Sequence, residues 1–198
     1  MSEFLIYFEI GLRHILNIGD YAPILFLIAL SSPYIFKDWK KLLLLVTIFT
    51  LAHTFAMFLA IYGVIFIRTN LMGILMLLTI LFTALFHLFT VGKSTKNESI
   101  SVIGFLTLFF GVIRGLGYAN NFKTLLGAHP KKIALPILEA ATGIEVGQIV
   151  VVLVILILGY IVQTVFRFSK RDWTLVITAF VIGVVLPMIL ENGIWFIK

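Results

Sequence analysis

The sequence contains no cysteine, which excludes disulfide bonds, thiolate metal sites and cysteine nucleophiles together. Charge is also scarce, since only 12% of the 198 residues are Asp, Glu, Lys or Arg, about half the share typical of a soluble domain. A Ser-His-Asp order, a phosphate-binding loop and a nucleotide-binding glycine pattern are likewise missing from the chain. These absences leave no support for the chemistry of a soluble enzyme.

Apolar residues dominate the chain instead, making up 61% of the sequence and giving a mean hydropathy of +1.14. Each helical crossing of a bilayer needs about 20 mostly apolar residues, so the length allows roughly six or seven crossings and little else. Backbone groups in lipid must find their hydrogen-bond partners within their own helix. We therefore expect a single domain over residues 1–198, an all-α polytopic membrane bundle of six to seven transmembrane helices that contacts the lipid bilayer.

Seven apolar segments follow one another, over residues 3–17, 22–36, 42–67, 70–91, 99–119, 135–166 and 173–197. The first two should form the shortest helices, either tilted, half-buried or packed as a hairpin. Asn17, Gly19 and Asp20 predict the turn between them. Pro23 suits the first turn of the second helix, where its missing N–H is harmless.

The net charge of +6 comes from basic residues in the short connectors between these segments. They form no patch with interleaved aromatic residues, so they predict membrane orientation and no nucleic-acid site. With seven crossings, the larger group of cations lies on one side and comprises Lys37, Lys40, Lys41, Lys93, Lys96, Arg167, Lys170 and Arg171. The smaller group on the other side comprises Arg68, Lys123, Lys131, Lys132 and Lys198. This bias predicts a cytoplasmic N-terminus and an external C-terminus.

Ionisable side chains inside the apolar segments carry the functional argument, because each costs about 2.5 to 3.5 kcal/mol at mid-membrane. Glu9 and Arg13 are four residues apart and are expected to pair on one helix face. Three others lie near expected span ends and favour an interfacial position: His87, His129 and Glu191. His53 lies at the middle of its segment between Thr50 and Thr54, and it remains a candidate ligand.

Arg114 and Glu145 are the other deep charges, and each lies between two glycines spaced four residues apart. The flanking glycines are Gly111 and Gly115 for the arginine, and Gly143 and Gly147 for the glutamate. Small residues at this spacing let helix backbones approach closely. Pairing opposite charges is the least costly way to bury both, so we predict a direct ion pair between Arg114 and Glu145. These two residues should converge with His14 and His53 on one internal polar cluster.

Four short motifs occur in order along the chain: GLRHIL at 11–16, FTLAHT at 49–54, GVIRGLGYA at 111–119 and GIEVGQ at 143–148. Together they resemble the HupE/UreJ family of bacterial membrane proteins, named for hydrogenase and urease accessory roles. The stretch from 162 to 195 resembles the branch of that family found in Bacteroidetes-type bacteria. The resemblance implies a small inner-membrane protein with a polar, metal-binding centre, described as a nickel or cobalt permease or an accessory factor.

Carried over position by position, the resemblance implies a set of metal ligands within a polar centre. The implied ligands are His14, Asp20, His53 and Glu145, and the implied polar centre adds Tyr21, Arg114 and Gln148. The two histidines match the first two histidines of the family, while Glu145 and Gln148 match its glutamate and glutamine. Imidazole nitrogen and carboxylate oxygen suit nickel, cobalt or zinc, and three or four such ligands make a competent site.

Two positions depart from the family pattern and weaken the implied site. In the family an Asp-His pair follows the first histidine. Counting forward from His14 places Asp20 and Tyr21 at this pair, whereas counting back from Phe26 and Leu27 places Ala22 and Pro23 there. The family's HGLGF motif begins here with Arg114. Arginine keeps its positive charge and cannot ligate a metal. A bound divalent ion is therefore expected to be weak or absent.

Three classes of function stay open. The first is transport, in which His14, Asp20, His53 and Glu145 line a cavity that admits a divalent ion or a small polar solute. The second is metal-dependent hydrolysis within the membrane, with Glu145 as general base. The third is a scaffold, natural or engineered, that keeps the fold but has lost the site. Arg114 favours the scaffold over the hydrolase, because a hydrolytic metal needs a full ligand set and an open position.

Overall fold

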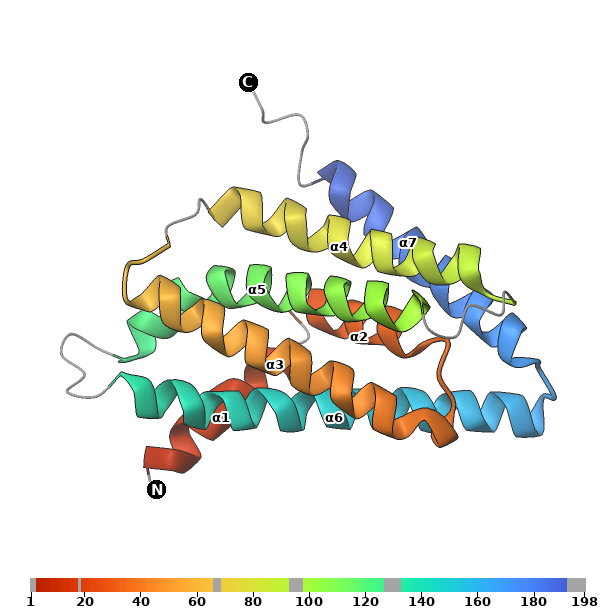
Figure 1. Cartoon of the computed structure of the whole chain (residues 1–198), viewed down its shortest axis with the longest axis horizontal. Helices are drawn as coiled ribbons and strands as arrows, with labels where there is room; N and C mark the ends of the chain where they lie inside the picture. The colour runs from red at the N-terminus through yellow and green to blue at the C-terminus, as the bar shows by residue number, and fades with distance from the viewer. Residues whose placement is uncertain (1–2, 18, 66–68, 93–97, 127–132, 192–198) are drawn as a thin grey trace.

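The computed structural model describes residues 3–17, 19–65, 69–92, 98–126 and 133–191. The described residues form seven α-helices and one short 3-10 helix (Figure 1). In chain order these are α1 (Glu3–Leu16), α2 (Ala22–Ser31), η1 (Phe36–Asp38), α3 (Trp39–Ile61), α4 (Thr69–Thr90), α5 (Glu98–Leu126), α6 (Ala134–Val165) and α7 (Lys170–Glu191). All regular structure in the described ranges is helical, and the predicted all-α membrane bundle is confirmed.

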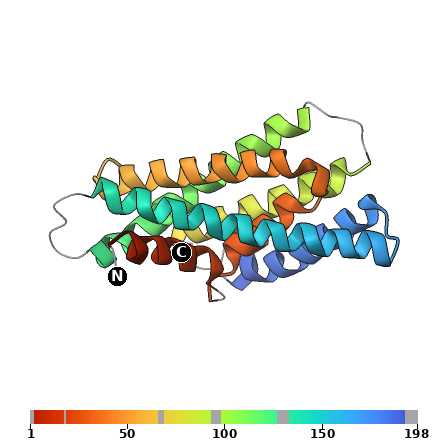
Figure 2. The same cartoon turned by 90° about the horizontal axis from the view of Figure 1, so that it is seen from below.

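Five of the described helices, α3 to α7, are long and apolar enough to cross a membrane, whereas α1 and α2 are not. With 14 and 10 residues, these two span about 21 and 15 Å at 1.5 Å per residue, against a hydrocarbon core of about 30 Å. Figures 1 and 2 show α1 running from one end of the bundle toward its middle, and α2 continuing from there to the opposite end. Together they extend along the length of the bundle as one path that is broken halfway (Figures 1 and 2).

Of the three arrangements left open for the first two helices, the hairpin is not the one observed. Helix α1 packs mainly on α6, whereas α2 packs on α4, α6 and α7. The two helices therefore bury different faces at different depths of the bundle and have few contacts with each other. The predicted turn is present, with Asp20 N–H donating to the carbonyl of Asn17 at 3.2 Å, and it lies midway along the bundle (Figure 1) with Asn17 and Gly19 exposed.

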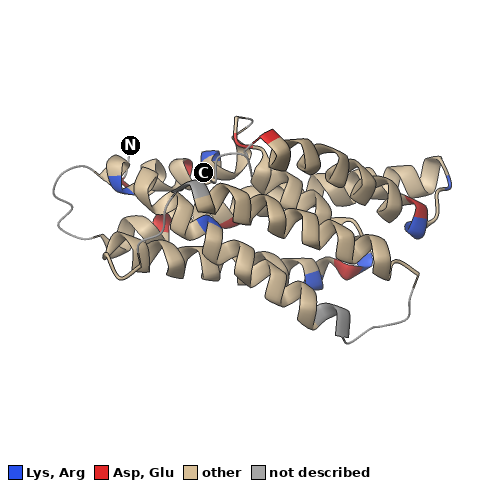
Figure 3. Ribbon diagram, turned by 90° about the horizontal axis from the view of Figure 1, so that it is seen from above, with Lys and Arg blue, Asp and Glu red and all other residues tan. Residues whose placement is uncertain are grey.

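The break also bears on which side of the membrane the N-terminus lies. Helix α1 begins at the end of the bundle where α5 meets α6, and the α2–α3 connection lies at the opposite end (Figure 1). Long stretches of the helices carry no charged residue (Figure 3). The connection that carries Lys37, Lys40 and Lys41 thus lies at the other end of the bundle from the start of α1 (Figure 1), whereas the predicted topology places both on the same side of the membrane. Six predicted connector or terminal cations lie outside the described residues: Arg68, Lys93, Lys96, Lys131, Lys132 and Lys198.

A pair of topology reporters tests this arrangement. The basic residues at the α2–α3 and α6–α7 connections favour that end as the cytoplasmic one. A reporter fused after Lys41 should therefore give a cytoplasmic signal, and one fused ahead of residue 3 should give an external signal. The same signal from both fusions would mean that α1 and α2 cross the membrane separately.

Two helix pairs pack backbone against backbone at glycines. A Cβ atom at Gly111 of α5 would lie 2.7 Å from the carbonyl oxygen of Phe49 in α3, and one at Gly115 would overlap the carbonyl of His53. In the same way, a Cβ atom at Gly143 of α6 would overlap the carbonyl of Phe8 in α1. The two glycine motifs do permit close approach, but they bring their helices to two different partners.

An aromatic cluster fixes α2 against α3 and α5. The rings of Phe26 and Phe110 stack with centroids 3.9 Å apart, and the ring of Phe49 lies 6.0 and 5.5 Å from them. All three side chains are buried. Phe110 precedes Arg114 by one helical turn, so this cluster holds the helix break close to the deep arginine.

Candidate functional site

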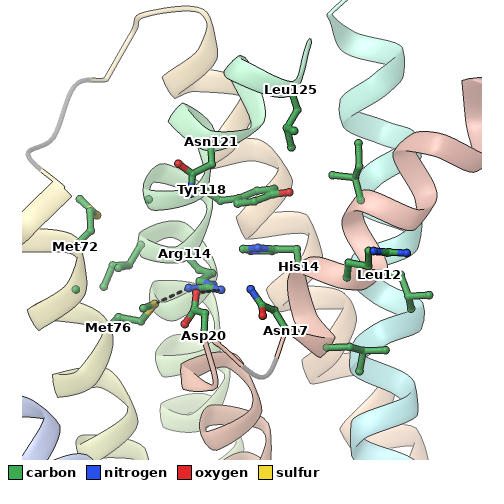
Figure 4. A pocket seen from close by; sticks show the side chains of 16 residues that line it. Leu12, His14, Asn17, Asp20, Met72, Met76, Arg114, Tyr118, Asn121 and Leu125 are labelled. Atoms are coloured by element: carbon green, nitrogen blue, oxygen red, sulfur yellow. Dashed lines mark hydrogen bonds and ion pairs between the residues drawn. The ribbon is translucent and has the colours of Figure 1, made fainter. Parts of the chain in front are cut away.

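A cavity of about 1000 Å³ lies between α1, α4 and α5 at the break between α1 and α2 (Figure 4). Two arginines line it, Arg13 and Arg114. The other polar lining residues are His14, Asn17, Asp20, Tyr118 and Asn121. Met72 and Met76 face these groups from α4. The lining runs from Leu125 at the end of α5 inward to Arg114, about 17 Å along the helix at 1.5 Å per residue. The cavity thus reaches the middle of the bundle.

Arg114 and Asp20 form an ion pair at the deep end of this cavity. The Nη2 atom of Arg114 lies 2.7 Å from Oδ2 of Asp20, and Nη1 donates to the sulfur of Met76 at 3.4 Å. The arginine side chain is 7% exposed, whereas the aspartate side chain is 43% exposed. Among the described residues, the Nε–H finds no acceptor, and Nη2 makes no well-aligned hydrogen bond despite its contact with Asp20. The guanidinium is therefore neutralised but incompletely hydrogen-bonded.

The predicted ion pair between Arg114 and Glu145 is wrong, because each residue has another partner. Oε1 of Glu145 accepts a hydrogen bond from the Thr47 hydroxyl at 2.8 Å, so the glutamate faces α3 and does not line the cavity. The cause is the packing of the glycines, since Gly115 brings α5 onto α3 while Gly143 brings α6 onto α1. Sequence reasoning missed Asp20 as the partner because it assigned that residue to the turn between the first two helices and to the implied metal ligands.

Two histidines lie beside each other next to the cavity, and His14 lines it while His53 lies behind His14 in the core. The His14 ring stacks on Tyr118 with centroids 3.5 Å apart, and the His53 ring centroid lies 5.7 Å from that of His14. His53 is fully buried. In the part of the chain that the structure describes, both its ring nitrogens and Nε2 of His14 have no hydrogen-bond partner. Buried imidazole nitrogens without partners are costly, which makes this pair a candidate ligand site.

The full set of predicted ligands is not brought together. Within the described ranges, no three side chains among His, Asp and Glu lie close enough to hold one metal ion. Asp20 forms an ion pair with Arg114, and Glu145 accepts a hydrogen bond from the Thr47 hydroxyl. Of the four predicted ligands His14, Asp20, His53 and Glu145, the described structure places only the two histidines side by side.

The remaining predicted polar residues take separate places. Gln148 is fully buried and accepts a hydrogen bond from the Thr50 hydroxyl at 3.2 Å, on the face of α6 that carries Glu145. Tyr21 is exposed at the start of α2 and does not line the cavity, so it is not part of the centre.

Local predictions outside the centre have mixed outcomes. Glu9 and Arg13 pair as expected, with Nη2 2.6 Å from Oε1. Glu191 is exposed at the end of α7, as its interfacial prediction requires. His87 is instead buried within the bundle. His129 lies outside the described residues.

Comparison with known proteins adds one finding. A family model described as "HupE / UreJ protein" matches residues 1–193, which is nearly the whole chain. No curated protein and no solved structure gives a significant match.

Proposed function

Because the chain belongs to the HupE/UreJ family, we propose that it is a membrane transport or accessory protein whose cargo is a divalent transition metal. The family is associated with nickel and cobalt transport or accessory function, and zinc suits the same imidazole ligands. The bacterial inner membrane is the location that the family favours. The single observation that carries the proposal is that His14, which lines the cavity, lies beside the buried His53, with ring nitrogens of both lacking a partner among the described residues.

The spacing of the two rings fits one shared ion. Two imidazoles that each place a nitrogen about 2.0 to 2.1 Å from a tetrahedral metal have ring centres roughly 5 Å apart. The centroids of His14 and His53 are 5.7 Å apart, so a small movement of one ring brings them to that spacing. His14 also lines the open cavity, which gives an ion a route to the pair.

The ligand set predicts weak binding, which suits a cargo better than a resident ion. Two neutral imidazoles without a carboxylate supply half of a tetrahedral shell. Arg114 lies in the same cavity, although Asp20 neutralises it. Transport sites must bind well enough for entry and weakly enough for release. A site of two histidines meets that requirement.

The alternative of a metal-dependent hydrolase loses support because Glu145 is held by Thr47 and does not line the cavity. A hydrolytic ion also needs three protein ligands and an open position. The scaffold that has lost its site remains the alternative that experiment can separate from transport.

Titration of Ni²⁺ and Co²⁺ into the purified protein, prepared without chelator, tests the proposal. The wild-type protein should bind one ion per chain, and both His14→Gln and His53→Gln should weaken binding at least about tenfold, since each removes one of two ligands. His87→Gln is the matched control, because His87 is also buried and its Nε2 also has no partner among the described residues. It should bind as the wild type does.

Absence of binding in the wild type, or equal loss in all three variants, would favour the scaffold. Uptake of Ni²⁺ into proteoliposomes by the same variants then separates a permease from an accessory protein. A permease should show saturable uptake that both site variants reduce.

A further inference from the structure

We propose that the cavity also binds a small organic carboxylate, whose carboxyl group replaces Asp20 on Arg114. This site goes beyond the proposed metal cargo, because it uses the deep end of the cavity and none of the histidine nitrogens. The observations that carry it are the incompletely bonded guanidinium, the exposed and displaceable aspartate, and the charge and size of the cavity.

The guanidinium of Arg114 has more binding capacity than its present partners use. Arginine presents five donors in a planar fork that matches a carboxylate through two parallel hydrogen bonds. Asp20 contacts only Nη2, and the sulfur of Met76 is a weak acceptor for Nη1. In the described structure Nε has no acceptor. A carboxylate that enters from the cavity could bind Nε and Nη2 together, which Asp20 does not.

Asp20 is positioned as a replaceable occupant of this site. It lies in the turn between α1 and α2, and its side chain is 43% exposed, while Arg114 is fixed on a long helix and 7% exposed. The aspartate can therefore turn toward solvent, whereas the arginine stays in place. Breaks in membrane helices commonly mark the place where a solute binds, because their backbone ends line a cavity.

The lining of the cavity favours an organic anion. Its charged lining residues are Arg13, Arg114 and Asp20. Glu9 neutralises Arg13 at 2.6 Å, so displacement of Asp20 would leave Arg114 as the cation that a ligand must balance. A volume of about 1000 Å³ is at the upper end of ordinary small-molecule pockets and far exceeds the size of an inorganic anion. Met72 and Met76 offer adaptable apolar contacts for the body of such a ligand.

Calorimetric titration with hexanoate and hexanamide at constant ionic strength tests the site. The two probes share their apolar chain and differ in the charge of the head group, so hexanoate should bind and hexanamide should bind at least about tenfold more weakly. Arg114→Met should weaken hexanoate binding at least about tenfold. Arg171→Met removes an exposed arginine outside the cavity and should leave binding unchanged.

Asp20→Asn provides the sharpest comparison, because it removes the internal competitor while keeping the size of the side chain. It should tighten hexanoate binding by about tenfold or more. Equal binding of the two probes would overturn the proposal, as would equal loss in both arginine variants. An unchanged affinity of Asp20→Asn for hexanoate would contradict the proposed replacement of Asp20 by the ligand. Should Asp20→Asn not fold, the two arginine variants and the two probes still decide.

Metal titration of the Arg114→Met protein separates this proposal from the histidine site. Both histidines remain in that variant, so Ni²⁺ binding should be retained while hexanoate binding is lost. Loss of metal binding together with hexanoate binding would indicate one shared site, and the separate carboxylate site would then be wrong.

Discussion

Replacing Asp20 with asparagine is expected to destabilise the protein by about 3 kcal/mol, because it leaves a buried guanidinium without its counter-ion. The Arg114 side chain is 7% exposed and its closest charged contact is Asp20. The reverse replacement, Arg114→Met, should cost about 1 kcal/mol or less, because the stranded carboxylate is 43% exposed and can be hydrated. The ion pair is thus expected to be asymmetric. Thermal unfolding midpoints in detergent measure both effects.

A double-mutant cycle tests whether the two residues interact directly. Asp20→Asn should cost little once Arg114 is methionine, so the two single effects should not add. Glu145→Gln serves as the control, and its effect should add to that of Arg114→Met, because Glu145 bonds to Thr47. Strong coupling between Arg114 and Glu145, with none to Asp20, would restore the pair predicted from the sequence.

Alanine at Gly115 or Gly143 is expected to lower stability by about 1 to 3 kcal/mol or more, because the added methyl group has no space. The new Cβ atom would overlap the carbonyl of His53 in the first case and the carbonyl of Phe8 in the second. Neither carbonyl belongs to a flexible side chain, so whole helices must separate. The unfolding midpoint should fall in both variants.

Gly183→Ala is the matched control for this effect. Gly183 lies inside α7, and a Cβ atom there would have no described atom within 4 Å. Alanine is also the better helix former by about 1 kcal/mol, so the control should be neutral or slightly stabilising. A similar loss of stability in all three glycine variants would mean that the close helix contacts are not the cause.

The two proposed sites, for a carboxylate and for a metal ion, depend on these same two features. The contact at Gly115 places His53 beside the α5 face that carries Tyr118, and the pair with Asp20 holds the helix break against Arg114. A glycine variant that still folds is therefore expected to disturb the spacing of His14 and His53 before it affects the more distant helices.

Features that depend on neighbours in the sequence were predictable. The apolar segments give helices because each helix satisfies its own backbone groups. Glu9 and Arg13 pair because four residues separate them on one helix face. The glycine spacing also predicted close helix approach, and the motifs predicted the family that the match over residues 1–193 confirms.

The choice of partners was decided only by the tertiary structure. Arg114 and Glu145 are both deep charges beside glycines, and nothing local to either residue specifies which helix its glycines will meet. That choice depends on the rotation and order of helices that are distant in the sequence. In the folded bundle the two charges are apart, so Arg114 forms an ion pair with Asp20 and Glu145 accepts a hydrogen bond from Thr47. The same packing sets two helices that are each too short to span a membrane one after the other along the bundle (Figure 1), so the turn between them lies at the cavity, which local sequence could not specify.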